Sequence, residues 1–423
     1  MINYKIKKLP NGICLVTAPL PASEAVTILI LVGVGGRYEK AQQNGISHFL
    51  EHLFFKGSKQ NPSPYELSKK IDGLGASANA FTGEEYTGFY IQSDANDFEK
   101  SLGIISDLFL NPIFAAKEIE REKGVILEEA NMRHDVPQYF VQVLAQKQMF
   151  GNSSLGQDLV GKPETIKSIS RNDILDYFGN YSPKSTVIII TGNPKKFNWT
   201  GLAAKIFSQK SPSVKPKFAK IEKIKIATPI SSETRKVDQA HFVLSTITYP
   251  KSHPNRYIVS LIATILAGGM SSRLFREIRE KRGWAYYIKS DLSAYWDTGM
   301  IQFSAGVKQD KLTDSLKIIT REIEKLKTKG PDSDELQRAK RNLRGHLALG
   351  LEDSFEIASF LAEELLYSDK VRQPEEIING WQKVSKQDIQ KVCQEVFQSD
   401  RMGLSVISSK VATELKKTID LSK

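Results

Sequence analysis

The sequence has few cysteines and no long hydrophobic run, and each absence excludes a class of protein. Cys14 and Cys393 are its two cysteines and lie far apart, which excludes a disulfide framework or a cysteine-based zinc site. No apolar run approaches the roughly 20 residues that a membrane-spanning helix needs. Residues 1–5 lead directly into a strand-like segment, without a secretory or transit-peptide pattern. We therefore expect a cytoplasmic protein with no membrane partner.

The composition is otherwise that of a globular protein with excess positive charge. Hydrophobic residues make up 40% of the 423 residues and charged residues 25%, which excludes a largely disordered chain. The net charge of +11 suggests nucleic acid, but residues 1–208 contribute only +1, whereas residues 209–236 contribute +6. Residues 209–236 also contain three prolines and four serines, so we interpret them as a basic linker rather than a nucleic-acid-binding tail. We expect no nucleic-acid partner.

The two halves on either side of this linker resemble each other, which indicates an internal repeat at an offset of about 215 residues. The matching segments are 24–32 and 239–247, 87–93 and 299–305, 97–110 and 310–326, and 185–191 and 403–408. Ser170-x-x-Asp173 and Ser385-x-x-Asp388 each predict the capped start of a helix. We therefore predict the α+β class, with two homologous domains in tandem, 1–208 and 237–423, each a mixed or antiparallel sheet packed by helices.

Two of the six histidines lie close together in the first half. His48 and His52 belong to the string His48-Phe-Leu-Glu51-His52, in a segment with helical periodicity. Positions four apart lie on one face of a helix, so both imidazoles can bind one metal ion, with Glu51 beside them. This is the inverted zinc-peptidase motif, in which the metal acidifies a water molecule and the carboxylate carries its proton. The alternative is an amphipathic helix with partly exposed histidines and no metal.

A catalytic zinc of this kind needs a third protein ligand, and the acidic segment 118–133 is the candidate. Its pattern predicts a helix. The residues expected to be buried are Ile119, Ile126 and Met132. Glu122 and Glu129 are two turns apart on one face, which suits Glu129 as the ligand and Glu122 as a supporting residue. Spacing alone does not choose among the glutamates of this segment.

These segments together resemble the pitrilysin-type, inverted-zincin metallopeptidases of peptidase family M16 over essentially the whole chain. The resemblance begins at residues 9–12, passes through residues 35–39 and continues in residues 45–57. The chain is similar above all to the short members of this family, which are the bacterial processing-peptidase-like proteins and the β subunit of mitochondrial processing peptidase. The family's third ligand follows the second histidine by 77 residues and falls on Glu129, and its supporting glutamate falls on Glu122. The resemblance implies one Zn²⁺ per chain.

The resemblance also implies where a substrate binds. Residues around Ala78, Asn79, Ala80 and Phe81 resemble the family's substrate-binding edge strand. An exposed edge offers unpaired N–H and C=O groups, to which an extended peptide can add as another strand. The small side chains of Ala78 and Ala80 are equally consistent with tight packing.

The second half has lost the metal motif. At an offset of 217 residues, Glu122 corresponds to Ala339 and Glu129 to His346, which we therefore expect to be a surface or core histidine and not a ligand.

The second half has a dense basic segment of its own. Its Arg279 and Tyr286 match an Arg/Tyr pair that contacts substrate opposite the zinc in the family, where such groups can anchor or polarise a carbonyl. A basic surface helix over residues 272–281 is the alternative.

The sequence therefore predicts a zinc endopeptidase that hydrolyses short or unfolded polypeptides in a chamber, with Glu51 as general base. Because longer relatives pair two such two-domain units, the resemblance implies a homodimer, with a heterodimer as the alternative. The competing function is a non-catalytic partner subunit or peptide-binding module. The intact set of His48, Glu51, His52 and Glu129 favours the enzyme.

Overall fold

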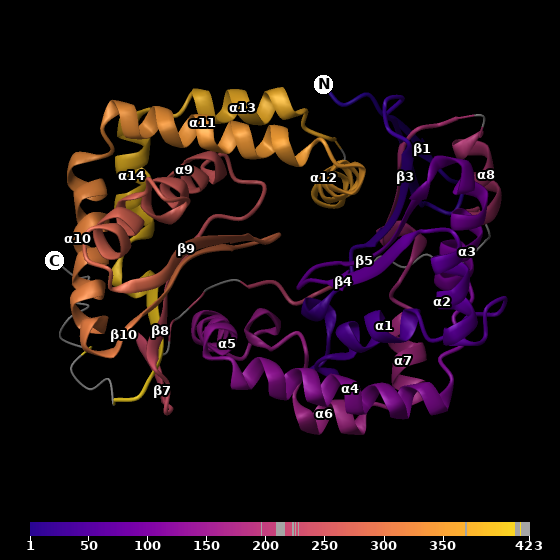
Figure 1. The fold of residues 1–423 in the computed structure, drawn as a ribbon, viewed down its shortest axis with the longest axis horizontal. Coiled ribbons are helices and arrows are strands. Elements are labelled where there is room, and N and C mark those ends of the chain that lie inside the picture. Colours follow the sequence, from indigo (N-terminus) through magenta and orange to yellow (C-terminus); the bar gives the residue numbers. More distant parts are fainter. Residues whose placement is uncertain are drawn as a thin grey trace. The chain divides into compact units, whose positions relative to one another are not determined.

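The protein is described by a computed structural model, which covers residues 1–195, 197–208, 216–221, 224, 226, 228–368, 370–410 and 415. The chain forms two compact units, each built around one β-sheet (Figure 1). Unit 1 contains Met1–Asn131, Asp158–Ala219 and Ala348–Gln373, and unit 2 contains Met132–Gln157, Lys220–Leu347 and Pro374–Lys423.

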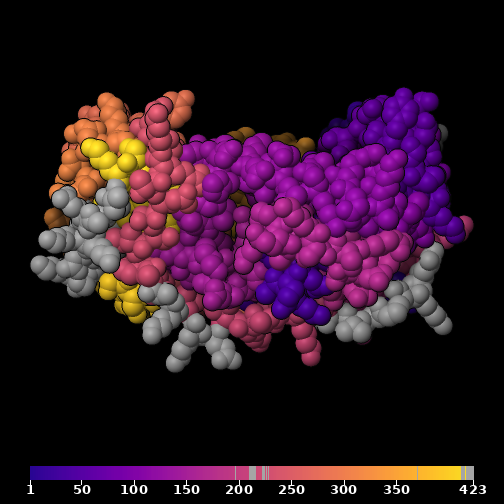
Figure 2. Space-filling model, turned by 90° about the horizontal axis from the view of Figure 1, so that it is seen from below, coloured from indigo at the N-terminus to yellow at the C-terminus, as the bar shows by residue number. Residues whose placement is uncertain are grey.

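The first sheet has the strand order β1-β2-β6-β3-β5-β4. Its strands are β1 (Lys5–Lys8), β2 (Cys14–Pro19), β3 (Ala25–Val32), β4 (Ser77–Thr82), β5 (Thr87–Asp94) and β6 (Thr186–Gly192). The accompanying helices are α1 (Ile46–Phe54), α2 (Pro64–Gly73), α3 (Phe98–Leu110), α4 (Ala116–Asp135), α6 (Pro163–Ser168), α7 (Arg171–Phe178), α8 (Trp199–Phe207) and α12 (Ser354–Tyr367). Short 3₁₀ turns are η1 (Gly36–Tyr38), η2 (Ala41–Gln43), η3 (Ala95–Asp97) and η5 (Pro183–Ser185). Figure 2 shows the surface of the molecule from below, coloured by residue number.

The second sheet has the order β7-β11-β8-β10-β9. Its strands are β7 (Ile230–Thr234), β8 (Gln239–Thr248), β9 (Ala285–Ala294), β10 (Gly299–Lys308) and β11 (Met402–Ser408). The helices are α5 (Pro137–Phe150), α9 (Arg256–Ala267), α10 (Leu312–Lys329), α11 (Ser333–Gly350), α13 (Pro374–Gln382) and α14 (Lys386–Val396). Short 3₁₀ turns are η4 (Ser154–Gly156), η7 (Gln309–Lys311) and η8 (Ser399–Arg401), and a π-helix, η6, spans Phe275–Glu280.

The five strands of the second sheet match β2, β6, β3, β5 and β4 of the first in order, in agreement with the repeat found in the sequence, and β1 is an addition to the first sheet among the described residues. In each, one parallel pair, β2 with β6 or β7 with β11, is followed by antiparallel strands. Both predicted capping boxes are present, because Ser170 accepts from the Asp173 N–H at the start of α7 and Ser385 accepts from the Asp388 N–H at the start of α14. The predicted α+β class is thus confirmed.

The central strands of each sheet are buried on both faces, and their side chains alternate between the two faces. Along β3, Val26, Ile28 and Ile30 join the core beneath α1 and α3, whereas Leu29 and Leu31 pack under α12. In unit 2, α9, α10 and α14 cover one face, and α5 packs on β8 and β11 across the other.

The predicted domain boundaries differ from these units in two respects. Unit 1 takes α12 from the second half and unit 2 takes α5 from the first half, because each sheet needs an apolar helix on its second face. The predicted linker, 209–236, lies partly outside the described residues, and its end forms β7, an edge strand of the second sheet. No helix of the described residues is long and apolar enough to cross a bilayer.

Candidate metal centre

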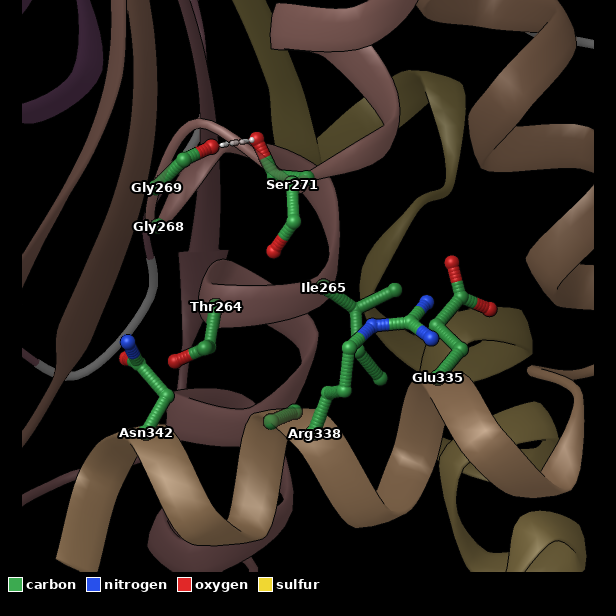
Figure 3. Close-up of a pocket in the computed structure, with 10 residues that line it drawn as sticks. Thr264, Ile265, Gly268, Gly269, Ser271, Glu335, Arg338 and Asn342 are labelled. Carbon is green, nitrogen blue, oxygen red and sulfur yellow. Dashed lines mark hydrogen bonds between the residues drawn. The ribbon is translucent and has the colours of Figure 1, made fainter. Parts of the chain in front are cut away.

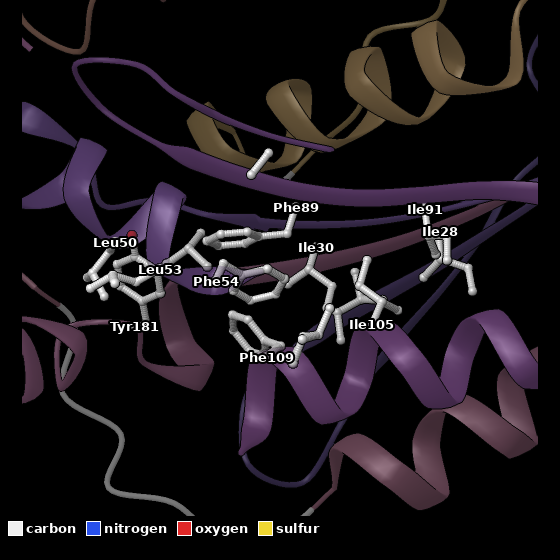
Figure 4. Packing of buried hydrophobic residues seen from close by; sticks show 14 of the residues in the cluster. Ile28, Ile30, Leu50, Leu53, Phe54, Phe89, Ile91, Ile105, Phe109 and Tyr181 are labelled. Atoms are coloured by element: carbon white, nitrogen blue, oxygen red, sulfur yellow. The ribbon is translucent and has the colours of Figure 1, made fainter. Parts of the chain in front are cut away.

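Helix α1 has one buried apolar side and one polar side. Its buried residues are Ile46, Ser47, Phe49, Leu50, Leu53 and Phe54. The ring of Phe54 stacks on Phe89 of β5 with centroids 3.8 Å apart, as Figure 4 shows within the core of unit 1. This packing leaves His48 and His52 on the polar side, with 12% and 19% of their side chains exposed.

Helix α4 presents its carboxylates to this polar side of α1. Its buried residues, Ile119, Glu122 and Ile126, are spaced by three and four and form one stripe. Glu129 continues that stripe with 28% of its side chain exposed. The prediction that Met132 is buried is wrong, because it lies about 240° around the helix from Ile126 and is 60% exposed.

The structure brings His48, His52 and Glu129 together. One oxygen of Glu129, Oε2, lies 3.5 Å from Nε2 of His48 and 3.5 Å from Nε2 of His52. One ligand atom from each residue lies within 4.8 Å of the other two. Three such donors converging from two helices suit a tetrahedral zinc ion with its fourth position open.

Glu122 and Lys56 support His52 from behind. Glu122 Oε2 lies 3.1 Å from His52 Nδ1, and Lys56 Nζ lies 2.8 Å from Glu122 Oε1. With Nδ1 donating to this buried carboxylate, the Nε2 lone pair of His52 faces Glu129. Sequence reasoning missed Lys56, which lies four residues after His52 and two residues beyond the end of α1.

The electrostatics of the site favour a bound cation. Burial lowers the pKa of His52, but hydrogen bonds to Glu129 and Glu122 and their charges outweigh it, so the pKa is raised above its ordinary value. Carboxylates that stabilise a proton here also stabilise a metal cation that replaces it. Two imidazoles and one carboxylate are a donor set that fits Zn²⁺.

Glu51 and the predicted peptide-binding strand lie in the same unit. Glu51 is half-buried on α1, one turn from His48. Ala78, Asn79, Ala80 and Phe81 lie on β4, which forms one edge of the first sheet and contacts α1. Ala80 is buried and Asn79 is exposed, so the strand has one packed and one open side.

Arg279 and Tyr286 lie together in unit 2. Arg279, at the end of the π-helix, donates a hydrogen bond to the backbone oxygen of Tyr286, the second residue of β9. The Tyr286 side chain is 74% exposed. The basic segment is helical over residues 273–280, as the alternative of a basic surface helix expected, and Tyr286 belongs to an edge strand.

Unit 2 has a pocket between the end of α9 and α11. Ala339 of α11, which matches Glu122 at an offset of 217 residues, lines this pocket. Figure 3 shows Glu335, Arg338 and Asn342 of α11 on its other side. His346, at the position matching Glu129, is exposed on α11.

The family models that match the sequence divide at the same repeat. "Insulinase (Peptidase family M16)" matches residues 15–163, and "Peptidase M16 inactive domain" matches residues 168–343. The first match contains the four motif residues His48, Glu51, His52 and Glu129, and the second contains the pocket of unit 2.

Solved structures share the fold. A protease from Helicobacter pylori superimposes with a TM-score of 0.87 at 22% identity, covering 96% of this chain and all of that one. A structure described as a peptidase M16 inactive domain, from Pseudomonas fluorescens, has a TM-score of 0.88 at 19% identity, covering 97% and 99%.

Sequence relatives extend over nearly the whole chain. YmxG of Bacillus subtilis, described as an uncharacterized zinc protease, is 32% identical over 94% of this chain and 96% of its own length. An uncharacterized zinc protease of Streptomyces coelicolor is 31% identical over 94% of this chain and 88% of its own length. With the metal-ligating geometry of unit 1 and the repeated α+β architecture, these matches show that the chain belongs to peptidase family M16.

Proposed function

We propose that the protein is a zinc-dependent endopeptidase that cleaves extended, unfolded peptides. The observation that carries the proposal is the convergence of His48, His52 and Glu129 from two helices, with Glu122 bound to the far side of His52. In this proposal the three residues hold one Zn²⁺ per chain, and Glu122 orients His52. The names of the relatives as zinc proteases support it.

Glu51 is the proposed general base. A zinc ion held at this site supplies a Lewis acid that polarises a peptide carbonyl and lowers the pKa of a water molecule towards about 7. Glu51 projects from the same helix as both histidines, so its carboxylate accepts the proton of the attacking water. It then donates that proton to the nitrogen of the leaving amine, which completes the hydrolysis.

The proposed substrate is a peptide that adds to β4 as a further strand. The backbone groups on the outer edge of β4 pair with such a peptide, and the residues from Ala78 to Phe81 contact its side chains. Because β4 contacts α1, a strand bound there runs beside the helix that carries Glu51. A folded substrate does not offer an extended strand, which limits the substrates to short or unfolded polypeptides.

Arg279 and Tyr286 are proposed to contact the same peptide. A guanidinium and a phenol on an exposed surface can donate hydrogen bonds to substrate carbonyls. In the proposed homodimer they act on the peptide bound to the other subunit. We place the enzyme in the cytoplasm, which suits a chain whose Cys14 and Cys393 are free thiols.

The test is zinc content and peptide cleavage of the Glu51→Gln variant. The wild-type protein should bind about one zinc per chain and cleave an unstructured peptide, whereas Glu51→Gln should retain the metal and lose cleavage by about 100-fold or more. Glu128→Gln, which changes an exposed carboxylate on α4, is the matched control and should keep both properties. Cleavage retained by Glu51→Gln would exclude the role given to Glu51. An intact, metal-free wild-type chain without cleavage would favour the non-catalytic partner subunit.

A further inference from the structure

The start of α1 has no capping side chain of its own. Gly45 occupies the N-cap position with φ of 93°, in the left-handed region, and has no side chain to accept the first N–H groups of the helix. The space around it is filled, because a Cβ there would lie 2.7 Å from the Cα of Gly161 and from the carbonyl oxygen of Val160. The first turn must therefore be capped from elsewhere in the chain.

Glu39, six residues earlier, supplies that cap. Its Oε2 accepts the backbone N–H of Gly45 at 2.8 Å, and its Oε1 accepts that of Ser47, the second residue of the helix, at 2.9 Å. Asn44 donates its side-chain N–H to the same Oε2 at 3.2 Å. One carboxylate thus bridges the N-cap and the first turn, and its negative charge complements the positive end of the helix dipole.

A second buried contact fixes the same turn. The hydroxyls of Ser47 and Tyr177 lie 2.7 Å apart, and Tyr177, on α7, donates to the carbonyl oxygen of Gly35 at 3.0 Å. Ser47 directly precedes His48. The backbone of Ser47 is therefore held by Glu39 and its side chain by Tyr177. These contacts leave the neighbouring His48 little freedom to rotate with the helix.

The carboxylate of Glu39 is buried, which disfavours its charged form. Glu39 is 8% exposed, and burial raises its pKa to about 7, although hydrogen bonds from Ser47, Gly45 and Asn44 lower it. A buried carboxylate costs stability unless its hydrogen bonds compensate. Here each of the three donors comes from the four-residue stretch 44–47 that starts the metal-binding helix.

We propose that Glu39 is a positioning residue, whose carboxylate sets the orientation of the first turn of α1 and thereby the affinity of His48 and His52 for the metal. Glu39 does not touch the ligands and acts through the backbone of residues 45–47. The inference rests on the proposed zinc site, and the wild-type zinc content tests that site separately.

The experiment compares zinc affinity in Glu39→Gln and Glu364→Gln, measured by competition with a chromophoric chelator at about pH 8, where the Glu39 carboxylate is ionised. The side chain of Glu39→Gln has one oxygen acceptor and places an NH₂ group among N–H donors, so we expect the zinc dissociation constant to rise about 10- to 100-fold. Glu364 is also buried in unit 1, where it accepts from Arg372, and its variant should stay within about twofold of wild type.

Circular dichroism and unfolding of the metal-free proteins check that each variant is folded. A folded Glu39→Gln protein with wild-type zinc affinity overturns the proposal, even if its stability is reduced, because stability alone would then be the role of Glu39. If Glu39→Gln does not fold, Glu39→Asp is measured instead, and wild-type affinity in that shorter carboxylate overturns the proposal equally. A wild-type protein without zinc would overturn the proposed function and this inference with it.

Discussion

Units 1 and 2 share the order of five strands and one capping motif, yet they differ where two helices cross beside an edge strand. In unit 1, α1 and α4 bring imidazoles and carboxylates together, whereas in unit 2 Ala339 stands at the position of Glu122 and lines a pocket between the end of α9 and α11. The difference lies in a few side chains and not in the architecture. The fold therefore tolerates either a metal-ligating or a non-ligating set at this crossing.

Helices α9 and α1 also differ in how much of their surface is buried. Helix α9 is buried on most sides, from Val259 to Ala267, which is typical of a helix inside a core. Helix α1 is buried on one side and keeps a polar stripe with His48 and His52. Helix α1 also differs in its start, where the buried carboxylate of Glu39 accepts the backbone N–H groups of Gly45 and Ser47.

The largest expected effect comes from replacing one histidine by alanine in each unit. We expect His48→Ala to lose stoichiometric zinc and to lower cleavage by more than about 100-fold. The loss of a metal ligand weakens zinc binding more than the loss of a residue that only orients a ligand. His346→Ala, at the position matching Glu129 in unit 2, should leave zinc content and cleavage unchanged, since His346 is exposed. Zinc analysis of the two purified variants checks this, and loss of metal in His346→Ala would contradict the division of roles.

A smaller effect is expected when a carboxylate is placed in the pocket of unit 2. Ala339 matches Glu122 but is 4% exposed among residues of α9 and α11. Ala339→Glu buries a carboxylate without the His and Lys partners of Glu122, so we expect a loss of about 1–3 kcal/mol in the free energy of unfolding. Asn342→Glu, on the exposed rim of the pocket, should change it by less than about 0.5 kcal/mol. Urea denaturation of both variants measures the difference, and equal stabilities would show that the pocket already accommodates a carboxylate.

Much of the candidate site follows from local sequence. The helix of His48 and His52 and the helix of Glu122 and Glu129 were predictable from periodicity, because each stripe is set within one element. The choice of Glu129 was not, because it depends on how α4 packs against α1. That choice came from the resemblance to family M16, and the structure places Glu129 beside both histidines.

Contacts that join distant segments were beyond the reach of sequence patterns. Glu39 caps a helix that begins seven residues later, whereas capping signals are read within about three residues of the helix start. The exchange of α5 and α12 between the halves was missed for the same reason, since apolar periodicity does not reveal which sheet a helix covers. Strand β7 was hidden by its basic, proline-containing surroundings, which predict a linker.

The smallest expected effect tests whether the repeat extends to energetics. Ser170→Ala and Ser385→Ala each remove the serine of a capping box, and each should cost about 1 kcal/mol of the free energy of unfolding.

Hydrogen bonds from the serines lower the pKa of both Asp173 and Asp388. The stabilisation from each aspartate is therefore present at neutral pH and is lost as the pH falls below the ordinary aspartate value of about 3.9 towards the lowered folded value. Thermal unfolding of the two variants against pH measures both effects. Similar losses at neutral pH that shrink together in acid would show that α7 and α14 are equivalent, whereas a loss confined to one variant would limit the repeat to its geometry.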